Sequence, residues 1–219
     1  MAPTLWFEWN KVDLSQFDAA VVGAGVSTNS ISVVTTAGES WVRIDATPVG
    51  GNVSIISGLV LLTISTTPPS ANYFIETDYV RLDSSTVQIA GAILVGRYVS
   101  LTQSYWLEEQ NMNPVSRKLT LTSKAYLDVI FAGAPSPAAQ VALRPLGQRM
   151  QLKFDGGVSS VQCGMLTHIF ETEADATPHT AAGKAGIGAS CGQTNLLGTV
   201  DSPGSAVSVL LRRIRCFTL

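Results

Sequence analysis

The sequence predicts an all-β protein, a jelly-roll β-sandwich of two antiparallel sheets. Short runs rich in aromatic and β-branched residues recur along the chain, and clusters of Gly, Pro, Asp and Ser separate them at intervals of about ten residues. Hardly any stretch repeats its apolar residues with helical spacing. Strands of this kind bury their apolar faces only when a second sheet covers the first, which favours a sandwich.

The composition is that of a folded protein, because 46% of the 219 residues are hydrophobic and 14% are charged. No long linker rich in Pro, Ser, Gly or charge interrupts the chain, so we expect a single domain over residues 1–219. The net charge of −2 provides no electrostatic footprint for nucleic acid. We interpret the basic cluster Arg212, Arg213 and Arg215 as solvated or interface charges rather than as a phosphate-binding site.

Two features of the sequence bear on location. The first nine residues, MAPTLWFEW, lack the basic region, the apolar core and the small-residue cleavage site of a signal peptide. The most hydrophobic run, residues 55–64 (IISGLVLLTI), is shorter than the roughly 18 apolar residues of a membrane-spanning helix, and its β-branched residues favour a buried strand. We therefore expect no signal peptide and no membrane partner.

The cysteines Cys163, Cys191 and Cys216 are odd in number and show no C-x-x-C spacing. This pattern predicts reduced thiols that pack as small apolar side chains, and it argues against a disulfide framework or a zinc site. We expect no cofactor and no metal.

Alternation of apolar residues and turn chemistry predict the individual strands. Residues 73–82 (YFIETDYVRL) and 86–98 (TVQIAGAILVGRY) form the longest pair, and the polar triplet between them predicts a long hairpin. A second hairpin is predicted at 148–163, because Asp155-Gly156 is typical of tight hairpin turns. Further strands are predicted at residues 4–12, 19–34, 41–45, 53–64, 119–122, 125–131 and 206–216.

Two segments between these strands are interpreted as loops. Residues 100–115 (SLTQSYWLEEQNMNPV) break the alternation and contain a short helix-like patch at 105–110, which predicts an extended loop with a short turn. Residues 171–188 are predicted to be a long loop that leads into a short strand. Because loops on a rigid sandwich often carry function, the aromatic residues of the first loop are candidate contact groups.

The order of these segments resembles the laminin-G-like (LamG-like), concanavalin A-like jelly-roll family of lectin folds. The shared features are an aromatic-x-Glu-x-Asp strand at 74–78, a strand end at Gly96-Arg97-Tyr98, a Phe-Asp-Gly turn at 154–156 and a small-residue segment at 183–186. The resemblance covers residues 70–216. It implies relatives among carbohydrate-binding modules, adhesive domains, glycoside hydrolases and structural proteins of bacteriophage particles, and the fold alone does not choose among them.

Glu76 and Asp78 are the first residues to consider for catalysis. Related jelly-roll glycosidases carry a Glu-x-Asp-x-x-Glu strand, in which alternate residues share a face and direct their carboxyl groups into one cleft. In this chain Arg81 occupies the position of the acid. We therefore expect no enzyme and no catalytic residues, and we expect Glu76 and Asp78 to lie on an exposed face or edge, paired with Arg or Lys.

Other polar groups also lack a full ligand or catalytic set. The acidic residues within 171–175 (ETEAD) offer oxygen ligands for calcium, but no Asp/Asn/Gly loop accompanies them, which favours a solvated loop. His168 and His179 have no acidic or cysteine partner in register for a zinc site or a catalytic triad. The Gly-x-Gly pairs at 23–25 and 186–188 lack the following helix that phosphate binding requires.

Four aromatic residues remain as candidate ligand or interface contacts, namely Trp41, Tyr98, Tyr105 and Trp106. Flat aromatic faces stack on pyranose C–H groups, and a few directed polar groups complete a sugar-binding site. Tyr105 and Trp106, followed by residues 108–111 (EEQN), supply both kinds of group. Packing in the core or a contact between subunits explains the same four residues.

These observations favour two functions of different classes. The first is a non-catalytic structural or interaction protein of a virus particle, most simply a bacteriophage head-decoration or tail-associated subunit. Its partners would be other virion subunits and further copies of itself, and it would be made in the host cytoplasm and located in the virion. The alternative is a carbohydrate-binding, lectin-like module whose partner is a cell-surface glycan.

Overall fold

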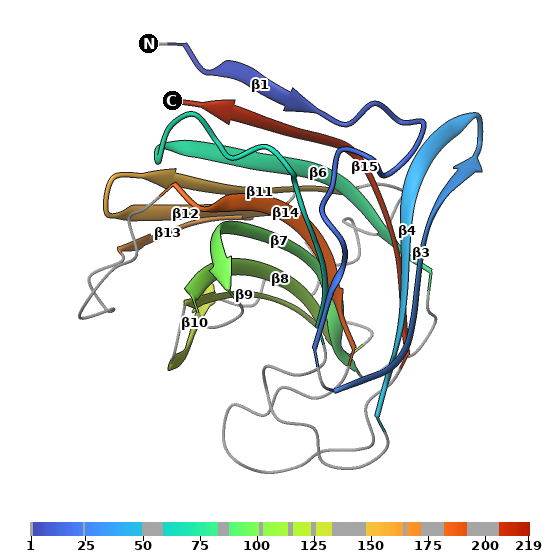
Figure 1. The fold of residues 1–219 in the computed structure, drawn as a ribbon. Coiled ribbons are helices and arrows are strands. Elements are labelled where there is room, and N and C mark those ends of the chain that lie inside the picture. The colour runs from blue at the N-terminus through green and yellow to red at the C-terminus, as the bar shows by residue number, and fades with distance from the viewer. Residues whose placement is uncertain are drawn as a thin grey trace.

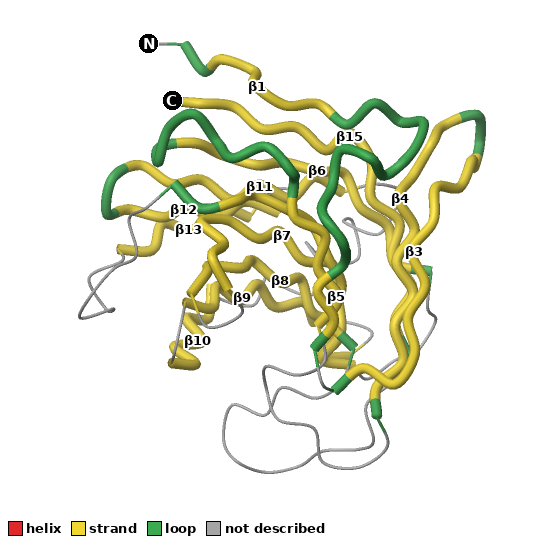
Figure 2. Tube along the Cα trace, in the orientation of Figure 1, coloured by secondary structure: helices red, strands yellow, loops and turns green. Residues whose placement is uncertain are grey.

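The computed structural model describes the chain in a series of segments, and every regular element in them is a β-strand. The strands form two antiparallel sheets that stack face to face (Figure 1 and Figure 2). The all-β jelly-roll prediction is therefore confirmed. The described residues are 2–23, 25–49, 59–82, 88–100, 103–113, 116–123, 126–132, 148–163, 166–171, 182–191 and 206–219.

The first sheet has the strand order β13-β12-β11-β6-β15-β4-β3, and β1 also pairs with β15. Its strands are β1 (Thr4–Glu8), β3 (Val26–Thr36), β4 (Glu39–Pro48), β6 (Tyr73–Arg81), β11 (Gln148–Asp155), β12 (Val158–Cys163), β13 (Leu166–Glu171) and β15 (Val207–Thr218).

The second sheet has the strand order β10-β9-β8-β7-β14-β5-β2. Its strands are β2 (Val21–Val22), β5 (Leu59–Thr63), β7 (Gln88–Ser100), β8 (Gln103–Asn113), β9 (Ser116–Ser123), β10 (Tyr126–Ala132) and β14 (Lys184–Ser190).

The last strand, β15, lies in the middle of the first sheet. The half of β15 before its bulge pairs with β4, the half after it pairs with β1, and β6 runs along its other side. The first and last strands are therefore neighbours, and the two chain ends lie close together (Figure 1). Sheet hydrogen bonds hold both terminal segments in place, whereas chain ends without such bonds are usually poorly ordered.

Alternation along the strands builds the core between the sheets. Tyr73, Ile75 and Tyr79 of β6 belong to the same buried cluster as Ala92 and Leu94 of β7. All five side chains are at most 3% exposed. Burial of one large apolar side chain stabilises the fold by roughly 1.5–3 kcal/mol. The face of each strand that carries these side chains is therefore the face that meets the core.

The predicted long hairpin is wrong, because β6 and β7 lie in different sheets. β6 pairs with β11 and β15, whereas β7 pairs with β8 and β14. The apolar residues of the two strands bury more surface when the strands oppose each other across the core than when they lie side by side. The linking triplet also lacks the Asn-Gly or Asp-Gly pair that closes a tight hairpin, and residues 83–87 lie outside the described part.

Two further segments differ from the sequence-based expectation. The predicted loop at 100–115 contains strand β8, which pairs in register with β7 and β9 and buries Tyr105 and Leu107. Two alternating apolar residues among polar ones were enough to form a strand between two neighbours. Strand β13, which pairs with β12, was not predicted. In the 171–188 segment, the strand β14 is found, and residues 172–181 lie outside the described part.

The predicted hairpin at 148–163 is confirmed as β11 and β12. Asp155 pairs with Val158 across the turn Gly156-Gly157, and Gly156 has a φ of 61°, a left-handed conformation that glycine adopts without strain. The buried strand expected within 53–64 is β5, whose five residues are all buried, whereas residues 53–58 lie outside the described part.

Three of the four segments that carry the family resemblance meet at one structural junction, and the segment 74–78 is not part of it. Arg97 is fully buried with a φ of 48°, donates from Nη2 to the carbonyl of Gly156 at 2.8 Å, and lies with its guanidinium 4.7 Å from the Phe154 ring centroid. A Cβ at Gly96 would collide with Phe154, and one at Gly183 would collide with the Arg97 backbone. These motifs therefore specify close packing between the sheets.

The Gly-x-Gly pair of β14 also has a packing role. A Cβ at Gly186 or Gly188 would collide with the carbonyl oxygen of Leu62 or Val60 in the neighbouring strand β5. The two glycines thus permit a close approach of two backbones.

Two of the three cysteines are described, and both are buried free thiols, as expected. Cys191 and Cys216 lie in the main core. The side chain of Cys163 lies outside the described part. Among the described residues, there is no helix with the length and apolar character needed to cross a membrane.

Candidate functional site

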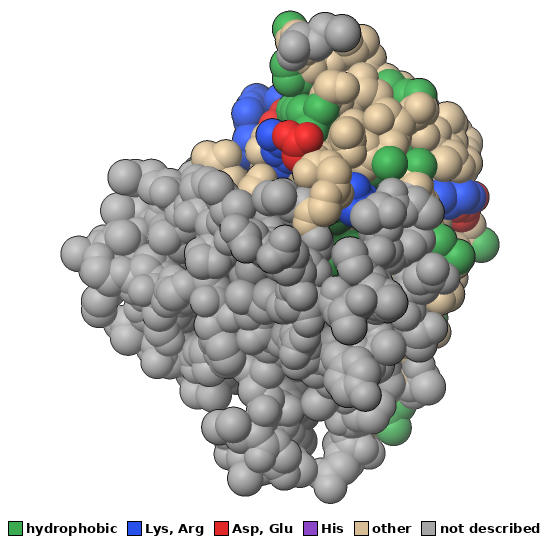
Figure 3. All heavy atoms as spheres, turned by 90° about the vertical axis from the view of Figure 1, so that its left-hand side faces the viewer, with side chains coloured by type: hydrophobic (Ala, Val, Ile, Leu, Met, Phe, Trp, Pro, Cys, Tyr) green, Lys and Arg blue, Asp and Glu red, His purple; other side chains and the backbone are tan. Residues whose placement is uncertain are grey.

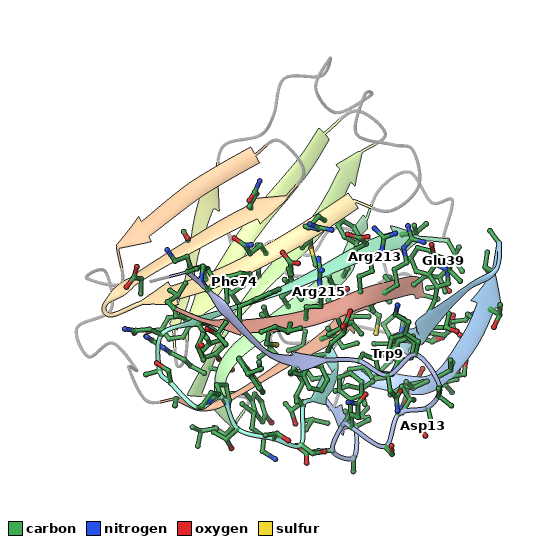
Figure 4. All side chains as sticks on the ribbon, turned by 90° about the horizontal axis from the view of Figure 1, so that it is seen from above. Trp9, Asp13, Glu39, Phe74, Arg213 and Arg215 are labelled. Atoms are coloured by element: carbon green, nitrogen blue, oxygen red, sulfur yellow. The ribbon has the colours of Figure 1, made fainter. Side chains whose placement is uncertain are left out.

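The outer face of the first sheet carries a group of paired charges contributed by β4, β6, β11 and β15. Residues of these strands that point away from the core share this face, and Figure 4 shows Phe74, Arg215, Arg213 and Glu39 following one another across it. We call the charged group the arginine–carboxylate network; it consists of Glu39, Glu76, Asp78, Arg149, Arg212, Arg213 and Arg215.

Glu76 lies at the centre of the network, on a strand flanked on both sides. Arg215 of β15 donates from Nη2 to Oε1 of Glu76 at 2.5 Å, and Gln151 of β11 donates to Oε2 at 3.4 Å. The Glu76 side chain is only 8% exposed. A carboxylate removed from water in this way requires such partners, because an unpaired buried charge is strongly destabilising.

Asp78 is held by arginines from both neighbouring strands. Arg149 of β11 donates from Nε to Oδ1 at 3.2 Å, and Arg213 of β15 lies with Nη1 3.3 Å from Oδ2. Arg212 is 3.7 Å from the same oxygen. The Asp78 side chain is 6% exposed, so these arginines replace nearly all of its hydration.

A β-bulge places two consecutive arginines over this carboxylate. The pairing of β15 with β6 shifts between Arg212 and Arg215, and Arg213 has a φ of 50°. A left-handed conformation costs a residue other than glycine roughly 1–2 kcal/mol, so the surrounding contacts must stabilise it. The bulge directs Arg212 and Arg213 toward the same acidic partners, Asp78 and Glu39.

Aromatic rings border the network at both ends. The guanidinium of Arg212 lies 4.4 Å from the Trp41 ring centroid, and that of Arg215 lies 5.8 Å from the Phe217 ring centroid. Phe217 stacks on Phe74 of the neighbouring strand, with a centroid distance of 4.7 Å and an interplanar angle of 17°. Phe74 and Phe217 are partly exposed, and we call them the aromatic pair.

The three predicted contact residues whose side chains are described, Trp41, Tyr98 and Tyr105, are not brought together into one site. Trp41 lies on the outer face of the first sheet beneath Arg212 and is 6% exposed. Tyr105 is 1% exposed and packs against Phe154 in the core, and Tyr98 packs against a small cluster of the second sheet. For Trp106 only the backbone in β8 is described. Their contact with a ligand or partner stays a prediction.

The expectation for Glu76 and Asp78 is confirmed in one respect and wrong in another. Both carboxylates pair with arginines, as predicted. However, β6 is a central strand and both residues are buried, because guanidinium groups cover them. The cluster at 212–215, interpreted as solvated or interface charge, is ion-paired within the chain. The contribution of Arg149 was missed because β6 and β11 are far apart in the sequence.

The network exposes two of its four cations and buries two of its three anions. Arg149 and Arg213 are 47% and 45% exposed, whereas Glu76 and Asp78 are 8% and 6% exposed. Solvent therefore contacts guanidinium groups that buried carboxylates hold in place. Figure 3 shows basic and acidic side chains next to one another on the described surface. Chemically, such a face donates hydrogen bonds to an anion.

Two carboxylates outside the network have lowered pKa values. Burial alone raises the pKa of Asp45, but hydrogen bonds from Arg43, Ser208 and Ser30 outweigh it. At Asp18, a hydrogen bond of 2.6 Å from the Lys184 ammonium is the largest cause of the lowered pKa. That pair ties the segment after β1 to strand β14 of the second sheet.

Metal ligands do not gather in the described part of the chain. There, no group of three or more His, Cys, Asp or Glu residues is placed to hold an ion. The predicted acidic segment reaches beyond the described residues after Glu171, and so does His179.

Solved structures share this fold, although no protein-family model and no curated protein sequence matches the chain. LamA from Z. galactanivorans, in complex with laminaritriose and laminaritetraose, has a TM-score of 0.57 and 10% identity over 98% of this chain and 99% of that one. The β-glucanase of Bacillus licheniformis has a TM-score of 0.55 and 12% identity over all of both chains. The CBM2 module of the evolved Dit of Lactobacillus casei BL23 phage J-1 has a TM-score of 0.52 and 9% identity, covering 99% and 96%. Identities this low show a common fold alone.

Proposed function

We propose that this chain is a non-catalytic structural or interaction protein of a virus particle, a LamG-like bacteriophage head-decoration or tail-associated subunit. The observation that carries the non-catalytic part is the occupation of both motif carboxylates by arginines. The fold shared with a module of a phage Dit supports the particle assignment.

The surroundings of Glu76 and Asp78 support the non-catalytic part of the proposal. Hydrolysis with retention needs one carboxyl as nucleophile and a second as proton donor, both reaching the sugar. Here each carboxylate is nearly buried and engaged by guanidinium groups, and Arg81 stands at the third motif position. A sugar would have to displace these ion pairs before it met either carboxylate. The two acids therefore position arginines and do not react.

Mass spectrometry of purified particles tests the particle assignment. Particles from a culture that carries the gene are banded by density and their proteins are digested. We expect peptides of this chain at many copies per particle, and we expect mass photometry of the recombinant chain to show a homo-oligomer. Its absence from particles, together with a strict monomer, would contradict the proposal. Incubation with laminarin tests the non-catalytic part, because release of new reducing ends would contradict it.

The aromatic pair favours a second candidate function, a carbohydrate-binding module. Phe74 and Phe217 present stacked, partly exposed rings beside polar side chains, an arrangement that suits the C–H face of a sugar. A glycan array with the full chain tests it. Loss of binding in Phe217→Ala would place the sugar on this face, whereas loss in Trp106→Ala would place it on strand β8. No binding to any glycan by a folded chain would remove the candidate.

A further inference from the structure

We propose that the outer face of the first sheet binds an anionic polysaccharide, with Arg149 and Arg213 holding its carboxylate or sulfate groups and the aromatic pair stacking on its sugar rings. This inference rests on the carbohydrate-binding candidate and adds the chemical class of the glycan. It concerns a different group of residues from the four that the sequence singled out.

The first observation is that exposed guanidinium groups of the network lie over a buried carboxylate. Asp78 is 6% exposed and lies beneath two guanidinium groups that are nearly half exposed, those of Arg149 and Arg213. Arg149 uses its Nε–H on Asp78, and a guanidinium has five N–H donors, so four of its donors are not used on that carboxylate. Four arginines meet three carboxylates in the network, which leaves one net positive charge at this surface. A planar anionic group fits such a fork.

The arginines are already held in place, which favours binding. Arg149 and Arg213 approach Asp78 from the strands on either side of β6, and both are fixed by the same carboxylate. The bulge at Arg213 holds its backbone in a conformation that only surrounding contacts stabilise. Little side-chain freedom remains to be lost when a ligand binds, so each new hydrogen bond contributes more of its energy to affinity.

The aromatic pair extends the same surface along the strands. Phe74 and Asp78 are both on β6, four residues apart and on one face, which corresponds to about 14 Å at 3.4 Å per residue. Glu76 and its partner Arg215 lie between them, and the Arg215 guanidinium also contacts the Phe217 ring. A continuous strip of rings and guanidinium groups therefore runs the length of a short oligosaccharide.

The modest charge favours a polysaccharide over a nucleic acid. The chain has a net charge of −2, and the network has a surplus of one positive charge. A nucleic acid carries a phosphate at every nucleotide and is bound through broad basic surfaces. A sugar polymer with spaced carboxylates or sulfates, whose rings also stack on aromatic side chains, matches two close guanidinium groups and one aromatic pair.

Affinity electrophoresis and calorimetry on the full chain test the inference with four probes: polygalacturonate, dextran sulfate, neutral laminarin and a single-stranded DNA oligonucleotide. We expect binding to polygalacturonate or dextran sulfate, and the better of the two identifies carboxylate or sulfate as the recognised group. Loss of a charge-assisted hydrogen bond should weaken this binding about tenfold or more in Arg149→Gln and in Arg213→Asn.

Lys11→Asn is the matched control, because Lys11 is also an exposed cation with a left-handed backbone, at φ 66°, and lies in the segment after β1. Asn tolerates the left-handed conformation, so it suits both position 11 and position 213. The control should bind as the unaltered chain does. If Arg213→Asn does not fold, as judged by circular dichroism, the half-exposed Arg149 provides the measurement through Arg149→Gln.

The possible failures are distinguishable. Laminarin binding as tight as that of the charged glycans would overturn the inference and keep the carbohydrate-binding candidate. DNA binding of equal affinity would overturn it by identifying a general anion surface. If no polysaccharide binds, both the inference and that candidate fall, while the particle assignment still depends on mass spectrometry alone. Equal losses of glycan affinity in Lys11→Asn and Arg213→Asn would overturn the placement of the binding site on the outer face of the first sheet.

Discussion

Replacing Arg215 with methionine tests whether the arginine–carboxylate network is a coupled unit. The change keeps the apolar stem but leaves Glu76, whose side chain is 8% exposed, without its closest partner. Removing one member of a fully buried ion pair costs about 3–5 kcal/mol. Arg215 is 29% exposed and Gln151 still reaches Glu76, so we expect a smaller loss of about 2–3 kcal/mol.

The double variant Arg215→Met/Glu76→Leu should recover most of that loss. It removes both charges and leaves two apolar side chains, of which the one at position 215 lies beside the Phe217 ring, so its stability should come within about 1 kcal/mol of the unaltered chain. Glu76→Leu alone should cost less than Arg215→Met, because the remaining arginine reaches water. Urea unfolding followed by tryptophan fluorescence gives the four free energies of the cycle. Additive losses, or a loss below about 1 kcal/mol in Arg215→Met, would refute the coupling.

Three further predictions concern other parts of the fold. Gly96→Ala should lower the free energy of unfolding by about 1–3 kcal/mol in urea titrations, because the new methyl group collides with Phe154. Burial raises the pKa of Cys191 to about 11, so its thiol should resist iodoacetamide at mildly alkaline pH and react only in denaturant, as peptide mass spectrometry will show. The pKa of Asp18 is lowered in the folded chain, so its carboxylate stabilises the fold at pH values above its unfolded-state pKa. This stabilisation is lost as the pH falls through the folded-state pKa. In an acid titration, Lys184→Met should therefore lose less stability than the unaltered chain does.

Each of these has an outcome that contradicts it. Unchanged stability in Gly96→Ala would mean that the junction has room for a methyl group. Alkylation of Cys191 at the same rate in the native and the unfolded chain would contradict its burial. Identical acid unfolding curves for the unaltered chain and Lys184→Met would show that the ammonium does not set the pKa of Asp18.

Alternation and turn chemistry were sufficient to predict most of the strands, but not their partners. The Asp155-Gly156 turn is a local signal, and the hairpin it predicts is present. The pairing of β6 with β11 and β15 joins segments far apart in the sequence, and no local pattern specifies it. The strand at Tyr105 was missed because a weakly alternating segment becomes a strand when two neighbours offer hydrogen bonds on both sides.

The sequence predicted that the two carboxylates of the candidate site pair with basic residues, but it did not predict which residues form the surface around them. The Glu76-x-Asp78 pattern beside Arg81 predicted basic partners for these acids, which the ion pairs confirm, and it predicted that they do not catalyse, which stays a prediction. Which arginines meet them depends on sheet order and on a bulge at Arg213, and a left-handed arginine leaves no trace in the sequence. The aromatic pair was missed for the same reason, because Phe74 and Phe217 become neighbours only when β6 pairs with β15.

The central position of β15 has a consequence for biosynthesis. Translation delivers residues 207–218 after β1, β4 and β6, yet β4 and β6 hydrogen-bond to opposite sides of this segment, and β1 also pairs with it. Until β15 has left the ribosome, those three strands keep open edges that nascent chains tend to join to one another. Completion of the first sheet thus waits for β15, and a product cut short before residue 207 is expected to aggregate rather than to form a smaller native body.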